Sequence, residues 1–173
     1  MVVDRQKWGH ESGAFTPLRS AVWVRMQPLW EDAASLSTAR AALIAWYEQH
    51  HRRFPWRETT DAYPILVSEV MSQQTQLERV EPAFRAFLQR WPAVEDLARS
   101  STDAVVRFWT THALGYNRRA RYLHAAAGQI VEEFDGVVPP DPAVLQTLPG
   151  VGPYTASAVA AFAYNTTTAV LDT

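Results

Sequence analysis

The sequence predicts an all-α protein, and three observations support this class. Apolar residues recur every three to four positions over most of the chain from Leu36 onward, which is the period of a helix with one buried face. Segments that alternate apolar and polar residues, as half-buried strands do, are nearly absent. No internal repeat of about 20–50 residues indicates a solenoid. We therefore expect a helical domain that contains no sheet.

Seven helices are expected, and several of them are bounded by residues that favour helix ends. Ser37 or Thr38 is a candidate N-cap for the first helix. Later boundaries are marked by the N-cap candidates Ser101 and Asp141, by Pro142 and Pro153 in first turns, and by Gly136 after a helix end. In chain order the approximate spans are 36–50, 63–74, 77–91, 102–109, 120–134, 142–148 and 153–163.

The N-terminal segment differs from the rest of the chain. Residues 1–34 include three tryptophans but follow neither the helical nor the strand period, so we expect an irregular arm or extension there. Residues 35–173 are expected to form the folded part. A length of 173 residues suits one domain of ordinary size.

Composition excludes several classes of function. The chain has no cysteine, so its residues cannot form disulfides, thiolate zinc sites or iron–sulfur ligands. Its five histidines show no metal-ligand spacing, and we assign no metal. No apolar run is long enough for a membrane helix, and we expect no secretory signal at the N-terminus. The absence of cysteine is compatible with a cytosolic protein. A net charge of −2 does not by itself indicate a nucleic-acid partner.

A glycine-rich turn lies between the last two expected helices. In Leu148-Pro149-Gly150-Val151-Gly152-Pro153, the glycines permit positive φ and close approach of another backbone. Pro153 then begins a helix whose N-terminal N–H groups and dipole suit a phosphate. Such a turn could hold a DNA backbone without reading bases. An ordinary helix–helix turn is the alternative interpretation.

Two carboxylates and a basic cluster are candidates for chemistry. Glu69 lies beside the apolar stripe of the second expected helix, where desolvation can raise the pKa of a carboxyl and make it a general acid; a solvated surface glutamate is the alternative. Asp172 follows a short apolar stretch and could stabilise a developing sugar cation, or cap a helix. Arg118 and Arg119 are suited to phosphate contact, or form a solvated helix end.

Four motifs in order give the chain a family resemblance. They are Phe54-Pro55-Trp56-Arg57, the Ser68–Thr75 stretch SEVMSQQT, Leu114-Gly115-Tyr116, and the Leu148–Gly152 turn followed by Asp172. Together they resemble the helix–hairpin–helix DNA glycosylases of the endonuclease III-like fold, and within them the MutY-type adenine glycosylases. The match runs from about Leu43 to Asp172. The resemblance implies an all-α helix–hairpin–helix glycosylase fold, with 35–173 as the N-terminal portion of a catalytic domain that is incomplete at its C-terminus.

The resemblance also implies roles for individual residues. Glu69 would protonate adenine at N7, and Asp172 would stabilise the sugar cation with support from Tyr154. Endonuclease III-like relatives carry a lysine at the position of Tyr154, and tyrosine cannot form their Schiff base. Trp56 and Arg57 would line the adenine pocket, while Gln74 and Tyr116 would insert into the duplex. The residues implied at the DNA backbone are Leu148, Gly150, Val151, Gly152, Arg118 and Arg119.

The activity implied is hydrolysis of the glycosidic bond of adenine mispaired with 8-oxoguanine or guanine, in base excision repair. The partner would be double-stranded DNA containing that mismatch, and the protein would be a cytoplasmic, nucleoid-associated monomer. The family carries a 4Fe-4S cluster, for which these 173 residues provide no ligands. Two alternatives stay open: a non-catalytic helix–hairpin–helix DNA-binding fragment, and an endonuclease III-like glycosylase, which Tyr154 disfavours.

Overall fold

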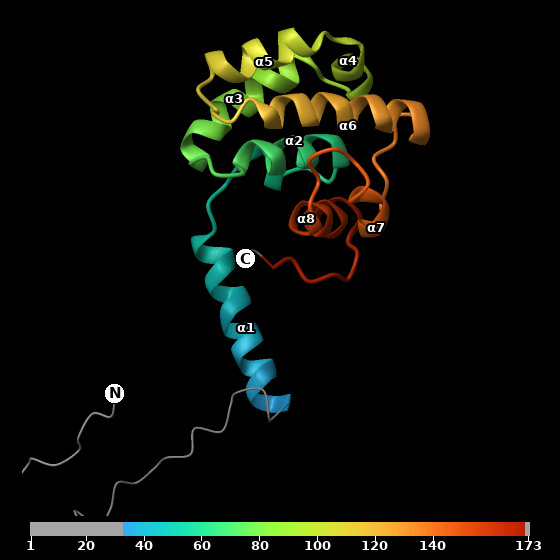
Figure 1. Ribbon diagram of the computed structural model, residues 1–173. Coiled ribbons are helices and arrows are strands. Elements are labelled where there is room, and N and C mark those ends of the chain that lie inside the picture. The colour runs from blue at the N-terminus through green and yellow to red at the C-terminus, as the bar shows by residue number, and fades with distance from the viewer. Residues whose placement is uncertain (1–32, 172–173) are drawn as a thin grey trace, which may run out of the picture. The chain divides into compact units, whose positions relative to one another are not determined.

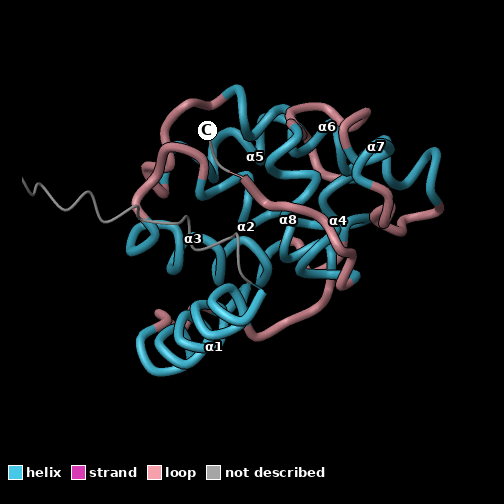
Figure 2. The backbone as a smooth tube through the Cα atoms, turned by 90° about the horizontal axis from the view of Figure 1, so that it is seen from below, coloured by secondary structure: helices cyan, strands magenta, loops and turns pink. Residues whose placement is uncertain are grey.

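The computed structural model describes residues 33–171, and within that range the chain is helical with connecting loops and no strand (Figures 1 and 2). The predicted all-α class is therefore confirmed. The chain divides into two compact units, Met1–His51 and Arg52–Thr173, and each is described by itself. Of the expected arm at 1–34, only Ala33 and Ala34 lie inside the described residues.

The first unit contributes one described helix, α1 (Ala33–His50). It begins before both predicted N-caps. The Thr38 hydroxyl donates to the carbonyl of Ala34 at 2.9 Å, one turn earlier, so Thr38 bonds within the helix and does not cap it. Near its end the rings of Trp46 and His50 stack with centroids 5.0 Å apart, as residues four positions apart on a helix can.

The second unit is built around α2 (Ala62–Ser72), which is buried along most of its length. Asp61 caps its first turn by accepting a hydrogen bond from the backbone N–H of Tyr63 at 3.1 Å. The helix packs against α3 (Leu77–Arg90), α6 (Arg118–Phe134) and α8 (Pro153–Tyr164), and Figure 1 shows it between α6 and α8. A short 3₁₀ turn, η1 (Pro55–Arg57), precedes it. Eight of the 11 residues of α2 are buried, so the core fixes the position of the helix.

A second layer covers the other side of α6. It contains α4 (Val94–Arg99) and α5 (Thr102–Thr111), and both pack against α6. Phe87, Trp91 and Phe108 form an aromatic cluster with ring centroids 4.7–5.5 Å apart. Most of the predicted spans are confirmed, because their apolar stripes are long enough to define a helical face.

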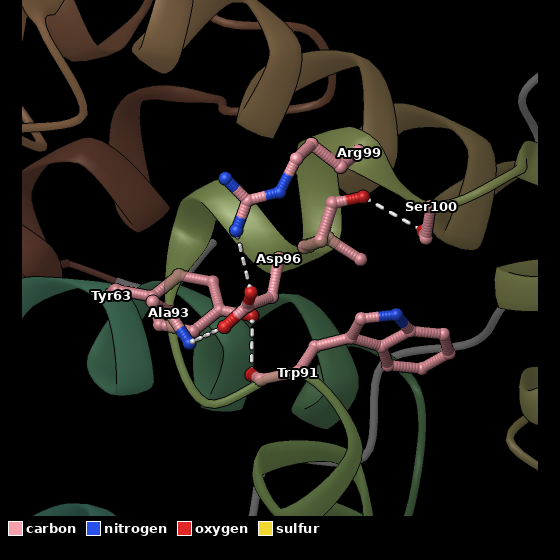
Figure 3. A network of polar contacts seen from close by, with 7 residues as sticks. Tyr63, Trp91, Ala93, Asp96, Arg99 and Ser100 are labelled. Atoms are coloured by element: carbon pink, nitrogen blue, oxygen red, sulfur yellow. Dashed lines mark hydrogen bonds and ion pairs between the residues drawn. The ribbon is translucent and has the colours of Figure 1, made fainter.

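The helix α4 was not predicted from the sequence. It is only six residues long and buries just Val94 and Leu97, which is too few positions to reveal a period. Its start is stabilised by the Asp96 carboxylate, which accepts from the Ala93 N–H at 3.2 Å (Figure 3). In the same network the buried Tyr63 hydroxyl donates to the carbonyl of Trp91 at 3.0 Å, which joins α2 to the segment before α4.

Two short elements complete the unit. The helix α7 (Pro142–Leu145) has the predicted cap, with Asp141 accepting from the Ala143 N–H at 2.8 Å. It packs against α8, which begins at Pro153 as predicted and ends at an Asn165 in the left-handed conformation (φ 52°). The turn between α7 and α8 is the glycine-rich segment.

Candidate active site

Residues from four separate segments line one cleft of about 930 Å³ in the second unit. The segments are α2 with the loop after it, the loop before α6, the first turns of α6, and the turn leading into α8. The lining residues are Glu69, Ser72, Gln73, Gln74, Tyr116, Asn117, Arg118, Arg119, Tyr122, Gly150 and Tyr154. Seven of the residues singled out in the sequence are therefore brought together: Glu69, Gln74, Tyr116, Arg118, Arg119, Gly150 and Tyr154.

Glu69 reaches the cleft from the central helix α2. Its neighbours Ser68 and Val70 are buried, at 1% and 4% exposure, while Glu69 itself is half-buried. Because α2 is fixed on several sides, the backbone that carries this carboxylate cannot shift without disturbing the core. A carboxylate held at the edge of an apolar core and open to a cleft is in a suitable place for proton transfer to a bound molecule.

Tyr154 enters the same cleft from the first turn of α8. It is 38% exposed, whereas the next residue, Thr155, is buried. The Gln73 side chain donates to the Thr155 hydroxyl at 3.4 Å, which links the end of α2 to the start of α8. The helices that carry Glu69 and Tyr154 are therefore joined both by apolar packing and by a polar contact.

Gln74 and Tyr116 lie on the two loops at the rim of the cleft, and both adopt strained backbone conformations. Their φ angles are 54° and 45°, in the left-handed region that residues other than glycine seldom occupy. Tyr116 is 67% exposed, so its ring projects into solvent beside the cleft. Strain of this kind is kept only where surrounding contacts fix the backbone, and it occurs often at binding sites.

Arg118 and Arg119 are adjacent but have different environments. Arg118 is exposed, and its guanidinium lies 5.2 Å from the centroid of the Tyr122 ring. Arg119 is partly buried and directs its guanidinium at backbone carbonyls at the end of α2 and in the loop before α6. Burial lowers the pKa of Arg119 from its usual value. Of the two arginines expected at a phosphate, only Arg118 presents its guanidinium to solvent.

The glycine-rich turn is packed against α6. The side chains of Leu148 and Val151 are buried, so they anchor the turn and leave backbone atoms at its surface. Gly150 has φ 77°, and a Cβ at this position would lie 2.7 Å from Cβ of Tyr122. Gly152 has an ordinary φ of −90°, and nothing lies within 4 Å of where its Cβ would be. Only Gly150 therefore uses the positive φ that the sequence suggested for both glycines.

Five described residues that were predicted for the site do not line this cleft: Leu148, Val151 and Gly152 of the glycine-rich turn, and Trp56 and Arg57. Trp56 is buried in the core, where its ring stacks on Phe54 with centroids 4.7 Å apart. Arg57 is exposed and donates from Nη1 to the carbonyl of Arg52 at 3.0 Å. Asp172 lies outside the described residues.

Four residues that line the cleft were not predicted as site residues, although two of them belong to the Ser68–Thr75 motif: Ser72, Gln73, Asn117 and Tyr122. Helical spacing could have identified one of them. Tyr122 follows Arg118 by four positions on a helix, so the two share a face. The others are polar residues in or beside loops, and their position depends on tertiary contacts.

The part of the chain that the structure describes holds no group of three or more metal-ligating side chains. A 4Fe-4S cluster requires cysteine thiolates, and the sequence has none, so the residues present do not fit the cluster that the resemblance implies. Among residues 33–171, no helix is both long and apolar enough to cross a bilayer.

Comparison with known proteins gives consistent matches. A family profile described as "HhH-GPD superfamily base excision DNA repair protein" matches residues 67–173. The chain is 46% identical to an adenine DNA glycosylase of Mycolicibacterium smegmatis, over 80% of this chain and 47% of that protein. It is 40% identical to the adenine DNA glycosylase of Homo sapiens, over 83% of this chain and 28% of that protein. The chain thus spans less than half the length of these relatives.

Solved structures show the same fold. A thermostable thymine-DNA glycosylase superposes with a TM-score of 0.74 and 27% identity, covering 82% of this chain and 65% of that one. A trapped covalent intermediate of endonuclease III with DNA superposes with a TM-score of 0.69 at 19% identity, covering 81% of this chain and 64% of that one. The predicted helix–hairpin–helix glycosylase fold is confirmed.

Proposed function

The chain belongs to the HhH-GPD superfamily of base excision DNA repair proteins, and on this premise we propose that it carries the base-excision site of an adenine DNA glycosylase. One observation supports this above all: Glu69, Gln74, Tyr116 and Tyr154, which come from three well-separated segments of the sequence, line one cleft. Its volume of about 930 Å³ falls in the range of about 300–1,000 Å³ usual for ligand pockets.

The proposed reaction is hydrolysis of the bond between C1′ of deoxyribose and N9 of adenine. Glu69 donates a proton to N7, so that adenine leaves with the bonding electron pair and without a full negative charge. The sugar becomes an oxocarbenium-like cation, which Asp172 stabilises by its charge. A water oxygen then bonds to C1′ and releases a proton, which completes hydrolysis. Tyr154 supports this end of the site and cannot form a Schiff base, so no strand cleavage through an imine is expected.

DNA would be held in two ways. The backbone of the Leu148–Gly152 turn and the exposed Arg118 would contact phosphates without reading sequence. Gln74 and Tyr116 would enter the duplex at the position vacated by the flipped adenine and thereby offset part of the cost of unstacking. The substrate we propose is double-stranded DNA in which adenine faces 8-oxoguanine or guanine. The protein would act on it as a monomer in the nucleoid.

The decisive experiment is single-turnover excision of adenine from a duplex with an A:8-oxoguanine pair. Loss of a general acid typically lowers the rate by about 10²–10⁴-fold, so Glu69→Gln should reduce excision at least about 100-fold. Glu132→Gln makes the same chemical change at an exposed position of α6 and is the matched control. Excision by Glu69→Gln at the control's rate would exclude Glu69 as the acid.

The two alternatives give different results in the same set of assays. Duplex binding without any base release would favour a non-catalytic DNA-binding protein. A covalent adduct trapped by borohydride would favour a glycosylase–lyase of the endonuclease III kind, since only an imine can be reduced in this way.

A further inference from the structure

The Arg119 side chain makes six hydrogen bonds, to the end of α2 with the loop after it and to the loop before α6, which lie about 40 residues apart in the sequence. Nη1 donates to three carbonyls at the end of α2, those of Val70 at 3.0 Å, Met71 at 3.1 Å and Gln73. Nη2 donates to the Thr75 hydroxyl at 3.0 Å and to the carbonyls of Leu114 at 2.6 Å and Gly115 at 3.4 Å. The planar guanidinium therefore connects the loop after α2 to the loop before α6.

The helix dipoles around Arg119 favour a structural role for its positive charge. Arg119 is the second residue of α6, and a positive charge at a helix N-terminus is unfavourable. The same charge lies at the C-terminus of α2, where unpaired carbonyls and the helix dipole favour a cation. Nε of Arg119 is buried and has no hydrogen-bond partner. Leaving a buried donor unpaired is costly, so the contacts of the two Nη groups must outweigh this cost.

One other contact joins the same two loops, and two more hold the loop before α6 in place. The Thr75 hydroxyl lies 3.2 Å from the carbonyl of Leu114, to which it donates. The indole N–H of Trp109 donates to the carbonyl of Gly115 at 2.8 Å. The guanidinium also lies 5.7 Å from the centroid of the Tyr116 ring. Arg119 is the one member of this group that contacts both loops and the end of α2.

The two loops carry Gln74 and Tyr116, whose left-handed backbones require support from their surroundings. From these contacts we infer that Arg119 is a positioning residue, whose single guanidinium holds Gln74 and Tyr116 in place at the rim of the cleft for entry into a distorted duplex. The part of this inference that concerns entry into a duplex rests on the proposed function. The part that concerns the coupling of the two loops rests on the structure alone. The position of Arg119 beside Arg118 in the sequence suggests a phosphate contact. The structure instead directs its guanidinium at the backbone of the two loops.

Lysine is the informative replacement. Arg119→Lys keeps the charge, but one ammonium group cannot reach both loops as the planar fork does. We expect the backbone amides of residues 73–76 and 113–117 to exchange hydrogen at least about tenfold faster in this variant, while those of α5 and α8 keep their rates. Arg121→Lys, at an exposed position two residues later on α6, is the matched control and should leave both loops unchanged. Arg119→Met removes all the hydrogen bonds of the guanidinium and should loosen both loops further. If this variant does not fold, the result for Arg119→Lys alone tests the inference.

The functional readout separates positioning from simple charge. In Arg119→Lys, the single-turnover excision rate should fall about 10–100-fold, while affinity for an undamaged duplex changes less than about threefold. Faster exchange in one loop only, a uniform increase along the chain, or an affinity loss as large as the rate loss would each overturn the inference. Absence of excision by the unaltered protein would refute the proposed function instead, and hydrogen exchange would still test the coupling of the loops.

Discussion

Replacement of Gly150 by alanine tests how the glycine-rich turn is held against α6. The residue has φ 77°, and the left-handed region costs a residue with a Cβ about 1–2 kcal/mol. The new Cβ would also lie 2.7 Å from Cβ of Tyr122, with ring atoms at 3.0 and 3.1 Å. The nearest atom is the root of the side chain, so rotation of the ring cannot remove the overlap. Forcing extra volume into a packed contact typically costs a further 1–3 kcal/mol or so.

The free energy of unfolding should therefore fall by about 2–5 kcal/mol in Gly150→Ala, unless the turn separates from α6. Urea titration measures this as a lower midpoint at an unchanged slope. If the turn separates locally, the global loss is smaller, but hydrogen exchange in residues 146–152 rises and affinity for duplex DNA falls. Both responses follow from the same contact with Tyr122.

Gly152→Ala is the control for this experiment. Its φ of −90° suits alanine, and no atom lies within 4 Å of the added methyl group. We expect a loss below about 1 kcal/mol, which reflects only the poorer N-cap. If Gly150→Ala matches this control in unfolding midpoint, loop exchange and duplex affinity, the reasoning about the turn is refuted.

Three further predictions concern stability. Gly128 lies inside α6 with open space around its Cβ position, so Gly128→Ala should raise the free energy of unfolding by about 0.5–1 kcal/mol in a urea titration, and a decrease would contradict this. Asp141→Ala removes the cap of α7 and should cost about 1 kcal/mol, measurable as a lower thermal midpoint, whereas Asp141→Asn should retain most of it. Tyr63→Phe deletes a buried hydrogen bond to Trp91 and should cost about 1–2 kcal/mol at pH 7. Burial also raises the pKa of Tyr63. Its contribution to the free energy of unfolding is therefore complete below the unfolded pKa of about 10 and declines as pH rises above that value. Free energies of unfolding measured from pH 8 to 11 should fall less steeply in Tyr63→Phe than in the unaltered protein.

The sequence predicted most helices because their apolar stripes are long. The stripe on α2 and the proline and glycine signals around α7 and α8 gave their positions closely. The six-residue α4 was missed, since Val94 and Leu97 alone do not define a period. Helix ends depend on local chemistry, and here Thr38 shows that a capping residue type can lie inside a helix when its hydroxyl bonds one turn back.

The candidate site was predictable only in part. Motif resemblance selected Glu69, Gln74, Tyr116 and Tyr154, and the structure brings all four to one cleft. It could not reveal that Arg119 contacts backbone carbonyls, because those partners come from two distant loops and backbone atoms leave no trace in the sequence. Trp56 illustrates the converse: in the motif that suggested a base pocket, Phe54 and Trp56 are buried in the aromatic core of the unit.

The burial of α2 affects how this cleft can be altered. Because its neighbours on the helix fill the core, Glu69 cannot be moved by design without repacking the second unit. The rim is different, since Gln74 and Tyr116 project from loops whose side chains touch solvent. Substitutions meant to change how the cleft engages a duplex should therefore be made on the rim and not on the helix. Glu69, the proposed acid, would then keep its position while the rim is varied.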